Sequence, residues 1–206
     1  IVNMGVISNG TTLLDAGAIS VATGSMTLIK TLTASSSGTL SFVDGASSVV
    51  LDDTYKQYLF KFIDIHPASN NADFTFQADT GSNTNYNQTI TSSCFETYHN
   101  ESGNDTTLGY SAAGDLAQST NFQPLLRGIG NGNDENGCGT LQIFNPSDTV
   151  FYTHFIANGN LYLHNDYSRN MFVAGYFNQT AALTRFQFKM SSGNIDAGII
   201  KLYGIS

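Results

Sequence analysis

The last part of the chain shows the clearest alternation of apolar and polar positions. Phe186, Phe188 and Met190 are separated by single polar residues. Because successive side chains of a strand point to opposite faces, this pattern predicts a half-buried strand. The small, turn-prone residues Ser191-Ser192-Gly193-Asn194 follow, and then a second β-rich run, Gly198–Ile205. The pattern therefore predicts a β-hairpin that closes the domain.

The middle of the chain repeats this alternation in many short segments. Tyr58, Phe60 and Phe62 lie on one face of a strand predicted over Tyr55–Ile65, which ends at His66-Pro67 because proline cannot donate to the ladder. Such segments recur at intervals of about ten residues, and none shows a helical apolar period of useful length. Further strands are predicted over Thr27–Leu32, Thr39–Val43, Phe74–Gln77, Tyr86–Tyr98, Asn121–Ile129 (interrupted by Pro124), Thr140–Phe144, Val150–Ala157, Asn160–His164 and Met171–Tyr176.

This spacing predicts an all-β fold, an antiparallel β-sandwich or jelly-roll-like domain over residues 31–206. Residues 1–30 are expected to form an N-terminal β arm. They consist of short apolar pieces broken by Gly and Asn, with a hairpin signal at Ser8-Asn9-Gly10. The arm has too few apolar residues for a core of its own. We therefore expect it to pack on the main domain or on a neighbouring chain, and we favour the neighbouring chain. A flexible break is predicted at Ala34–Gly38.

Composition narrows the classes of function. The chain has 206 residues, of which 41% are hydrophobic, and no apolar run of about 20 residues, so we expect one soluble domain. Its formal net charge of −8 repels nucleic acid and anionic membranes. Only 12% of residues are charged, against a usual share of roughly 25%, and such a surface suits an assembled or extracellular protein. Ile1–Gly10 lacks the basic start and apolar run of a signal peptide.

The cysteines and histidines give little support for a metal site. Cys94 and Cys138 lack paired ligand spacing, and we favour two free thiols over one disulfide. His154 and His164 are expected to face each other across a hairpin turned at Asn158-Gly159, but no third ligand is indicated. We therefore expect no metal and no cofactor.

The acidic residues do not form a recognisable catalytic pair. The loop Asn131–Gly137 has the composition of a calcium loop but lacks the closing glutamate, so a solvated surface loop is favoured. Asp52-Asp53 and Asp134-Glu135 are adjacent residues, which on a strand point to opposite faces and cannot flank one glycosidic bond. No G-x-S-x-G elbow occurs. We expect the protein not to be an enzyme, although carboxylates brought together by the fold remain an alternative.

Three segments resemble proteins of tailed bacteriophages. The closing pattern from Ser191-Ser192-Gly193-Asn194-Ile195 to Leu202-Tyr203-Gly204-Ile205 resembles the ending of small structural proteins of phages that infect marine bacteria and cyanobacteria. Ser8–Ile19 is similar to phage fibre and virion-surface segments, and Tyr55–Pro67 resembles a strand of the same kind of domain. The resemblance implies a β-sandwich or jelly roll on the virion exterior, often trimeric, in a head decoration or tail fibre.

The sequence thus favours a non-enzymatic structural protein of a virion, assembled with itself as a trimer and joined to other virion proteins through its arm. One alternative is a tail-fibre tip that binds a host receptor or glycan through loops Glu101–Thr107 and Asn131–Gly137. Another is an extracellular filament subunit joined by strand donation. The candidate ligand residues of the two loops are Glu101, Asn104, Asp105, Asn131, Asn133, Asp134 and Glu135.

Overall fold

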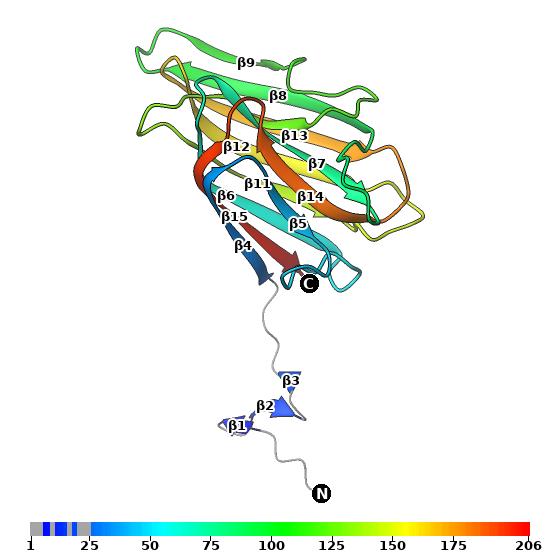
Figure 1. Ribbon diagram of the computed structural model, residues 1–206. Helices are drawn as coiled ribbons and strands as arrows, with labels where there is room; N and C mark the ends of the chain where they lie inside the picture. Colours follow the sequence, from blue (N-terminus) through cyan, green and yellow to red (C-terminus); the bar gives the residue numbers. More distant parts are fainter. Residues whose placement is uncertain (1–5, 9–10, 16–17, 20–25) are drawn as a thin grey trace, which may run out of the picture.

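The computed structural model describes residues 6–8, 11–15, 18–19 and 26–206 (Figure 1). These residues form strands joined by turns and loops, without a helix, and every strand pair is antiparallel. Among them no helix is therefore long and apolar enough to cross a bilayer. The prediction of an all-β antiparallel fold is confirmed.

Three short strands near the N-terminus make a small sheet of their own: β1 (Val6–Ser8), β2 (Thr11–Asp15) and β3 (Ala18–Ile19). Ser8 pairs with Thr11, so β1 and β2 are paired on either side of the predicted turn. Asn9 and Gly10 themselves lie outside the described residues.

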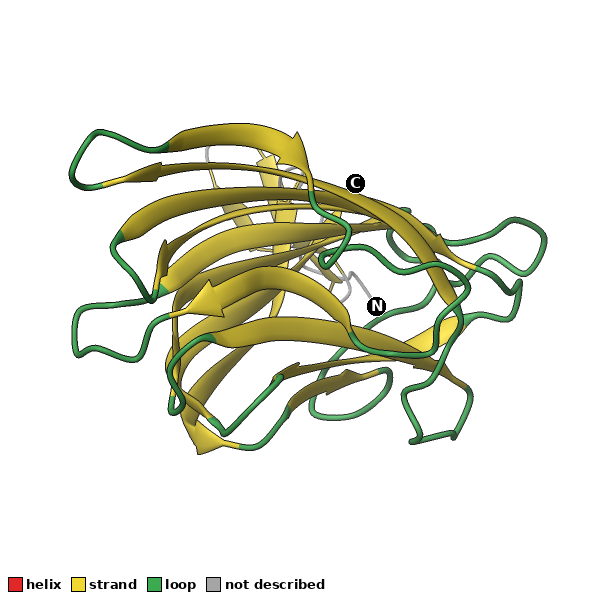
Figure 2. Cartoon of the chain, turned by 90° about the horizontal axis from the view of Figure 1, so that it is seen from above, coloured by secondary structure: helices red, strands yellow, loops and turns green. Residues whose placement is uncertain are grey.

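Twelve strands build the main sheet, which is nearly closed and barrel-like (Figures 1 and 2). They are β4 (Met26–Ser37), β5 (Leu40–Val43), β6 (Gln57–Pro67), β7 (Ala72–Thr80), β8 (Ile90–Asn100), β9 (Thr106–Tyr110), β10 (Gln123–Ile129), β11 (Gly137–Phe144), β12 (His154–Leu163), β13 (Tyr167–Phe177), β14 (Leu183–Met190) and β15 (Ile195–Ile205).

The main sheet consists of a long run and a short run of strands. The long run has the order β4-β15-β6-β11-β12-β13-β8-β9, and the short run β10-β7-β14-β5. The two runs are joined through one residue pair, Ile129 of β10 with Leu163 of β12. Because each strand buries alternate side chains, the two runs enclose a common apolar core.

Phenylalanine rings fill the centre of this core. Phe188 packs against five other rings, those of Phe42, Phe60, Phe62, Phe74 and Phe76, at centroid distances of 5.1 to 6.3 Å. Aromatic rings bury a large apolar area each, so this cluster supplies much of the driving force for folding. The predicted inward faces of the strands around Phe60 and Phe188 are thus confirmed.

The predicted C-terminal hairpin is wrong in its pairing. Both of its strands exist, but β14 pairs with β7 and β5, whereas β15 pairs with β4 and β6. The turn Ser191–Asn194 therefore crosses from the short run to the long run. Each of the two strands buries one apolar face in the same core. Strands in opposite runs can do this as well as neighbouring strands can, so the alternation predicts the buried faces but not the pairing.

The hairpin predicted at Asn158-Gly159 is also wrong. Strand β12 continues without a turn from His154 to Leu163, so His154 and His164 lie at opposite ends of it. Gly159 pairs with Gly139 of β11, and a Cβ atom on Gly159 would lie 2.4 Å from Cδ2 of Leu126. The glycine makes room for Leu126 of the short run rather than for a turn.

Smaller differences concern strand ends. Strand β4 runs through Ala34–Ser37, where a flexible break was predicted, and its start at Met26 takes in the end of the segment treated as an arm. Strand β8 starts at Ile90, and β12 at His154, later than predicted. Strand β9 was not predicted at all. Pro124 lies within β10, where the pairing with β7 shifts register.

Candidate functional site

The outward-facing side chains of five neighbouring strands in the long run form a broad surface, which we call the outer face. Its members alternate with core residues along β11, β12, β13 and β8, and the edge strand β9 continues the face beside β8. No Asp, Glu, Lys or Arg occurs among these outward positions. They are Cys138, Thr140, Gln142 and Phe144; His154, Ile156, Asn158, Asn160 and Tyr162; Ser168, Asn170, Phe172, Ala174 and Tyr176; Thr91, Ser93, Phe95, Thr97 and His99; and Thr106, Leu108 and Tyr110.

One half of the outer face is apolar, and we call it the aromatic patch: Phe95, Leu108, Tyr110, Ile156 and Phe172. Phe95 pairs with Phe172 on β13 and with Tyr110 on β9. The rings of Phe95 and Phe172 stack with centroids 4.6 Å apart. Leu108 is 73% exposed and Tyr110 64%. Large apolar side chains thus lie exposed side by side on four strands, and such a contiguous patch is typical of an interaction surface.

A second pair of rings borders the aromatic patch. Tyr152, in the loop before β12, stacks on Tyr176 with centroids 5.7 Å apart. The loop is held by Asp148, whose carboxylate accepts hydrogen bonds from the backbone N–H of Val150 (2.6 Å) and Phe151 (2.9 Å). These two bonds lower the pKa of Asp148, with the Phe151 bond the larger cause. The stacked pair of Tyr152 and Tyr176 therefore lies beside the aromatic patch, near the start of β12.

The other half of the outer face ends in a hollow of about 380 Å³, which we call the polar hollow. Its floor comes from strands β8, β13, β12 and β11, and its rim from the loops after β8 and before β11. It is lined by His99, Asn100, Glu101, Asp134, Asn136, Cys138, Asn160, Leu161, Tyr162 and Ser168. The two loops in which the sequence placed ligand residues therefore meet at one site.

Backbone pairing fixes the polar hollow. His99 pairs with Ser168, and Ser168 with Tyr162. The backbone N–H of Tyr162 donates to the carbonyl of Asn136 at 2.9 Å and so attaches the loop before β11 to the sheet. The Tyr162 hydroxyl donates to the carboxylate of Asp166 at 3.0 Å, and this bond is the main cause of the raised pKa of Tyr162. Tyr162 is therefore held both at its backbone and at its hydroxyl group.

The predicted ligand residues after β8 have different roles. Glu101 lines the polar hollow. Asn104 and Asp105 donate their backbone N–H groups to the side-chain oxygen of Asn100, each at 3.0 Å, and the Asp105 carboxylate accepts the Tyr167 hydroxyl at 2.9 Å. Asn104 and Asp105 thus hold the loop in shape and do not line the hollow.

The predicted ligand residues before β11 also divide. Asp134 lines the polar hollow. Asn131 donates to the carbonyl of Ala68 at 3.3 Å, and the Glu135 carboxylate accepts the backbone N–H of Gly132. Asn133 is exposed and lines no part of the hollow. Of the seven candidates, Glu101 and Asp134 alone are brought together there.

The histidines, cysteines and adjacent acids considered in the sequence form no cluster for a metal ion in the described ranges. Groups of three or more His, Cys, Asp and Glu side chains able to hold a metal ion are not found there. His154 lies against Tyr176, with ring centroids 5.6 Å apart. Asp52 accepts the backbone N–H of Thr54 at 2.8 Å, and hydrogen bonding to Thr54 lowers the pKa of Asp52. Both cysteines are free, Cys94 buried and Cys138 exposed.

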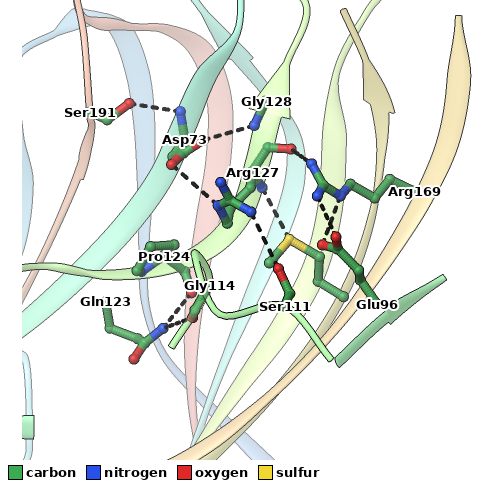
Figure 3. A network of polar contacts seen from close by, with 11 residues as sticks. Asp73, Glu96, Ser111, Gly114, Gln123, Pro124, Arg127, Gly128, Arg169 and Ser191 are labelled. Carbon is green, nitrogen blue, oxygen red and sulfur yellow. Dashed lines mark hydrogen bonds and ion pairs between the residues drawn. The ribbon is translucent and has the colours of Figure 1, made fainter. Parts of the chain in front are cut away.

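A network of polar contacts lies on the inner side of the same strands (Figure 3). Arg169 of β13 forms a two-bond ion pair with Glu96 of β8, at 2.6 and 2.9 Å, and donates to the carbonyl of Arg127 at 3.1 Å. Arg127 in turn lies 3.7 Å from the carboxylate of Asp73. Burial raises the pKa of Asp73, and the positive charge of Arg127 opposes this shift.

This network joins the far strands of the long run to the short run. Arg169 and Glu96 occupy inward positions of β13 and β8 where both side chains are only 13% exposed, so the two charges are paired with each other. Neither residue could be predicted from the sequence, because no spacing in the chain marks a pair of residues that meets diagonally across two strands.

Comparison with protein-family models, curated proteins and solved structures produced no match to this chain. The resemblance to phage structural proteins stays a prediction. The geometry of the outer face is therefore the basis for the function proposed below.

Proposed function

We propose that the chain is a non-enzymatic structural protein of a virion exterior, which assembles with copies of itself through the aromatic patch. The observation that supports this proposal most is that exposed aromatic and aliphatic side chains lie together on strands whose outward positions carry no charged residue. At the edge of the patch, the hydroxyl of Tyr110 donates to the carboxylate of Asp115. The cores of protein interfaces are depleted of charge and enriched in aromatic residues in this way. A trimer on a phage head or tail is the assembly that we expect.

The strand order supports the class of fold that this function requires. Eight strands follow the orders β4-β15-β6-β11 and β10-β7-β14-β5. Along the chain they alternate between the long and the short run, except that β7 and β10 both belong to the short one. This winding resembles that of a double-sheet jelly roll, an architecture found in viral capsid and lectin domains, and so supports the proposal. Strands β12, β13, β8 and β9 then widen one sheet and carry the aromatic patch.

Charge favours self-association at the aromatic patch. The net charge of −8 makes copies of the chain repel one another over most of their surfaces. A contact through an uncharged face places no like charges directly opposite each other and avoids the cost of burying unpaired charges. A second copy is therefore the partner that this face fits best.

The test is the mass of the protein in solution, measured by light scattering. We expect the full chain to be an oligomer, and the double variant Phe95→Ser/Phe172→Ser to be a smaller species. Leu28→Ser is the matched control, because Leu28 is a similarly exposed apolar residue on β4, at the other end of the long run. A chain lacking residues 1–25 keeps β4 whole and tests the arm. A monomeric full chain, or an oligomer unaffected by the double variant, would refute the proposed interface.

A second candidate function is recognition of a receptor or glycan at the tip of a fibre. The polar hollow favours it, because loops from two distant parts of the chain converge there on a rigid strand floor. Self-assembly and recognition use opposite halves of the outer face, so both are compatible in one protein.

A further inference from the structure

The polar hollow has free hydrogen-bonding groups that point to the chemistry of a ligand. The side chains of His99, Asp134 and Asn136 have no hydrogen-bond partner among the described residues. Asn160 donates its amide to Ser168 (3.0 Å) and to a backbone carbonyl, which leaves its side-chain oxygen free as an acceptor. Free hydrogen-bond acceptors thus outnumber free donors in the hollow. A ligand rich in hydroxyl groups can donate to these acceptors.

The charge of the polar hollow selects against anions. Glu101 and Asp134 contribute carboxylates, and its ten lining residues include no Lys or Arg. A sialic acid, uronic acid or phosphate group would have to enter a site that is negative in a protein of net charge −8. A neutral ligand avoids that cost.

The shape of the hollow fits a small saccharide. Its volume of about 380 Å³ lies near the lower end of the range for small-ligand sites. Tyr162 is half-buried at its wall, with its hydroxyl held by Asp166 at 3.0 Å. A ring fixed in this way offers an apolar face against the C–H groups of a sugar at little cost in side-chain entropy.

From these features we infer that the polar hollow binds a neutral saccharide, with Tyr162 as the stacking surface and Asp134, Asn160 and His99 as hydrogen-bonding partners. This inference develops the second candidate function and does not depend on self-assembly through the aromatic patch. The strand floor is preformed, so binding requires little rearrangement of the chain.

The test is binding of the full chain to an array of neutral and acidic oligosaccharides, followed by calorimetric titration with the best neutral sugar. We expect neutral sugars to bind and acidic ones not to. Tyr162→Ala and Asp134→Asn should each weaken binding at least about tenfold. Tyr152→Ala is the matched control, since Tyr152 is an exposed tyrosine beside the aromatic patch, and it should bind like the parent chain.

The outcomes separate this inference from the proposed assembly. Asp134→Asn changes one exposed loop residue, so its result does not depend on the folding of the Tyr162→Ala variant. No binding to any neutral sugar, a preference for acidic sugars, or loss of binding in Tyr152→Ala alone would overturn the inference. Light scattering on the same variants should give the parent mass, because none of them changes the aromatic patch.

Discussion

At the scale of single residues, Gly159 shows how one missing side chain lets two strand runs meet. We expect Gly159→Ala to lower the free energy of unfolding by about 1–3 kcal/mol, because the new methyl group overlaps Leu126. Denaturation with urea measures this change. Gly109→Ala is the control: Gly109 lies in β9 with no atom within 4 Å of a Cβ position, so its effect should be small. Equal effects of the two variants would contradict the packing role of Gly159.

Gly159 also marks a limit of sequence reasoning. Asn-Gly is a strong local signal for a turn, and the turn at Asn158-Gly159 was predicted for that reason. The contact that decides the structure comes from Leu126, more than thirty positions away in the chain. The inward positions of Phe60 and Phe188, in contrast, followed from alternation alone, because burial of one strand face needs no knowledge of the partner.

Cys94 gives the protein a predictable response to alkaline pH. Burial raises the pKa of its thiol to about 11, from an ordinary value of 9.0. Between these values the folded chain keeps a proton that the unfolded chain releases, so the free energy of unfolding should fall as pH rises from about 9 to about 11. Urea titrations across this range measure the fall. The variant Cys94→Ala should show a shallower decline, and identical slopes would rule out the thiol as a source.

At the scale of elements, the ion pair between Arg169 and Glu96 joins β13 to β8 beside Arg127 of the short run. Both side chains are 13% exposed. Arg169→Met leaves the carboxylate of Glu96 unpaired, and we expect a loss of about 3 kcal/mol in the free energy of unfolding. The double variant Arg169→Met/Glu96→Leu should lose less, because neither charge remains.

Urea denaturation of both variants and of Glu101→Gln tests this expectation. Glu101 is an exposed acid in the loop after β8, and its neutralisation should change the free energy of unfolding by less than about 0.5 kcal/mol. A double variant that is less stable than the single one would mean that the pair itself, rather than the avoidance of an unpaired charge, stabilises the fold.

The elements also show which part of a β fold a sequence determines. Strands such as β5, β6 and β10 were predicted close to their observed bounds, because each carries its own local signal. The pairing of β14 with β7 rather than β15 was not, since the turn at Ser191–Asn194 fits either a hairpin or a crossing between runs. The residues of a turn do not determine whether the next strand lies in the same run or in the opposite one.

At the scale of the whole molecule, the all-β class could be predicted and the candidate site only in part. Loops at one end of a β-sheet often carry ligand-binding residues, and Glu101 and Asp134 were predicted as ligands for that reason. Both line the same hollow. The floor residues Asn160 and Tyr162 were not proposed as ligands. Their outward direction depends on β12 being continuous, and the mistaken turn at Gly159 concealed it.

The charge of the whole molecule predicts how its assembly responds to salt. Copies with a net charge of −8 repel at long range, while the aromatic patch between them carries no charge. Raising the salt concentration from about 0.01 M to about 0.5 M shortens the screening length several-fold. The repulsion then weakens while the apolar contact is kept, so we expect the equilibrium to shift towards the oligomer. Sedimentation velocity at the two concentrations measures this shift. The Phe95→Ser/Phe172→Ser variant should respond little, and dissociation of the parent oligomer by salt would mean that ionic contacts hold it together instead.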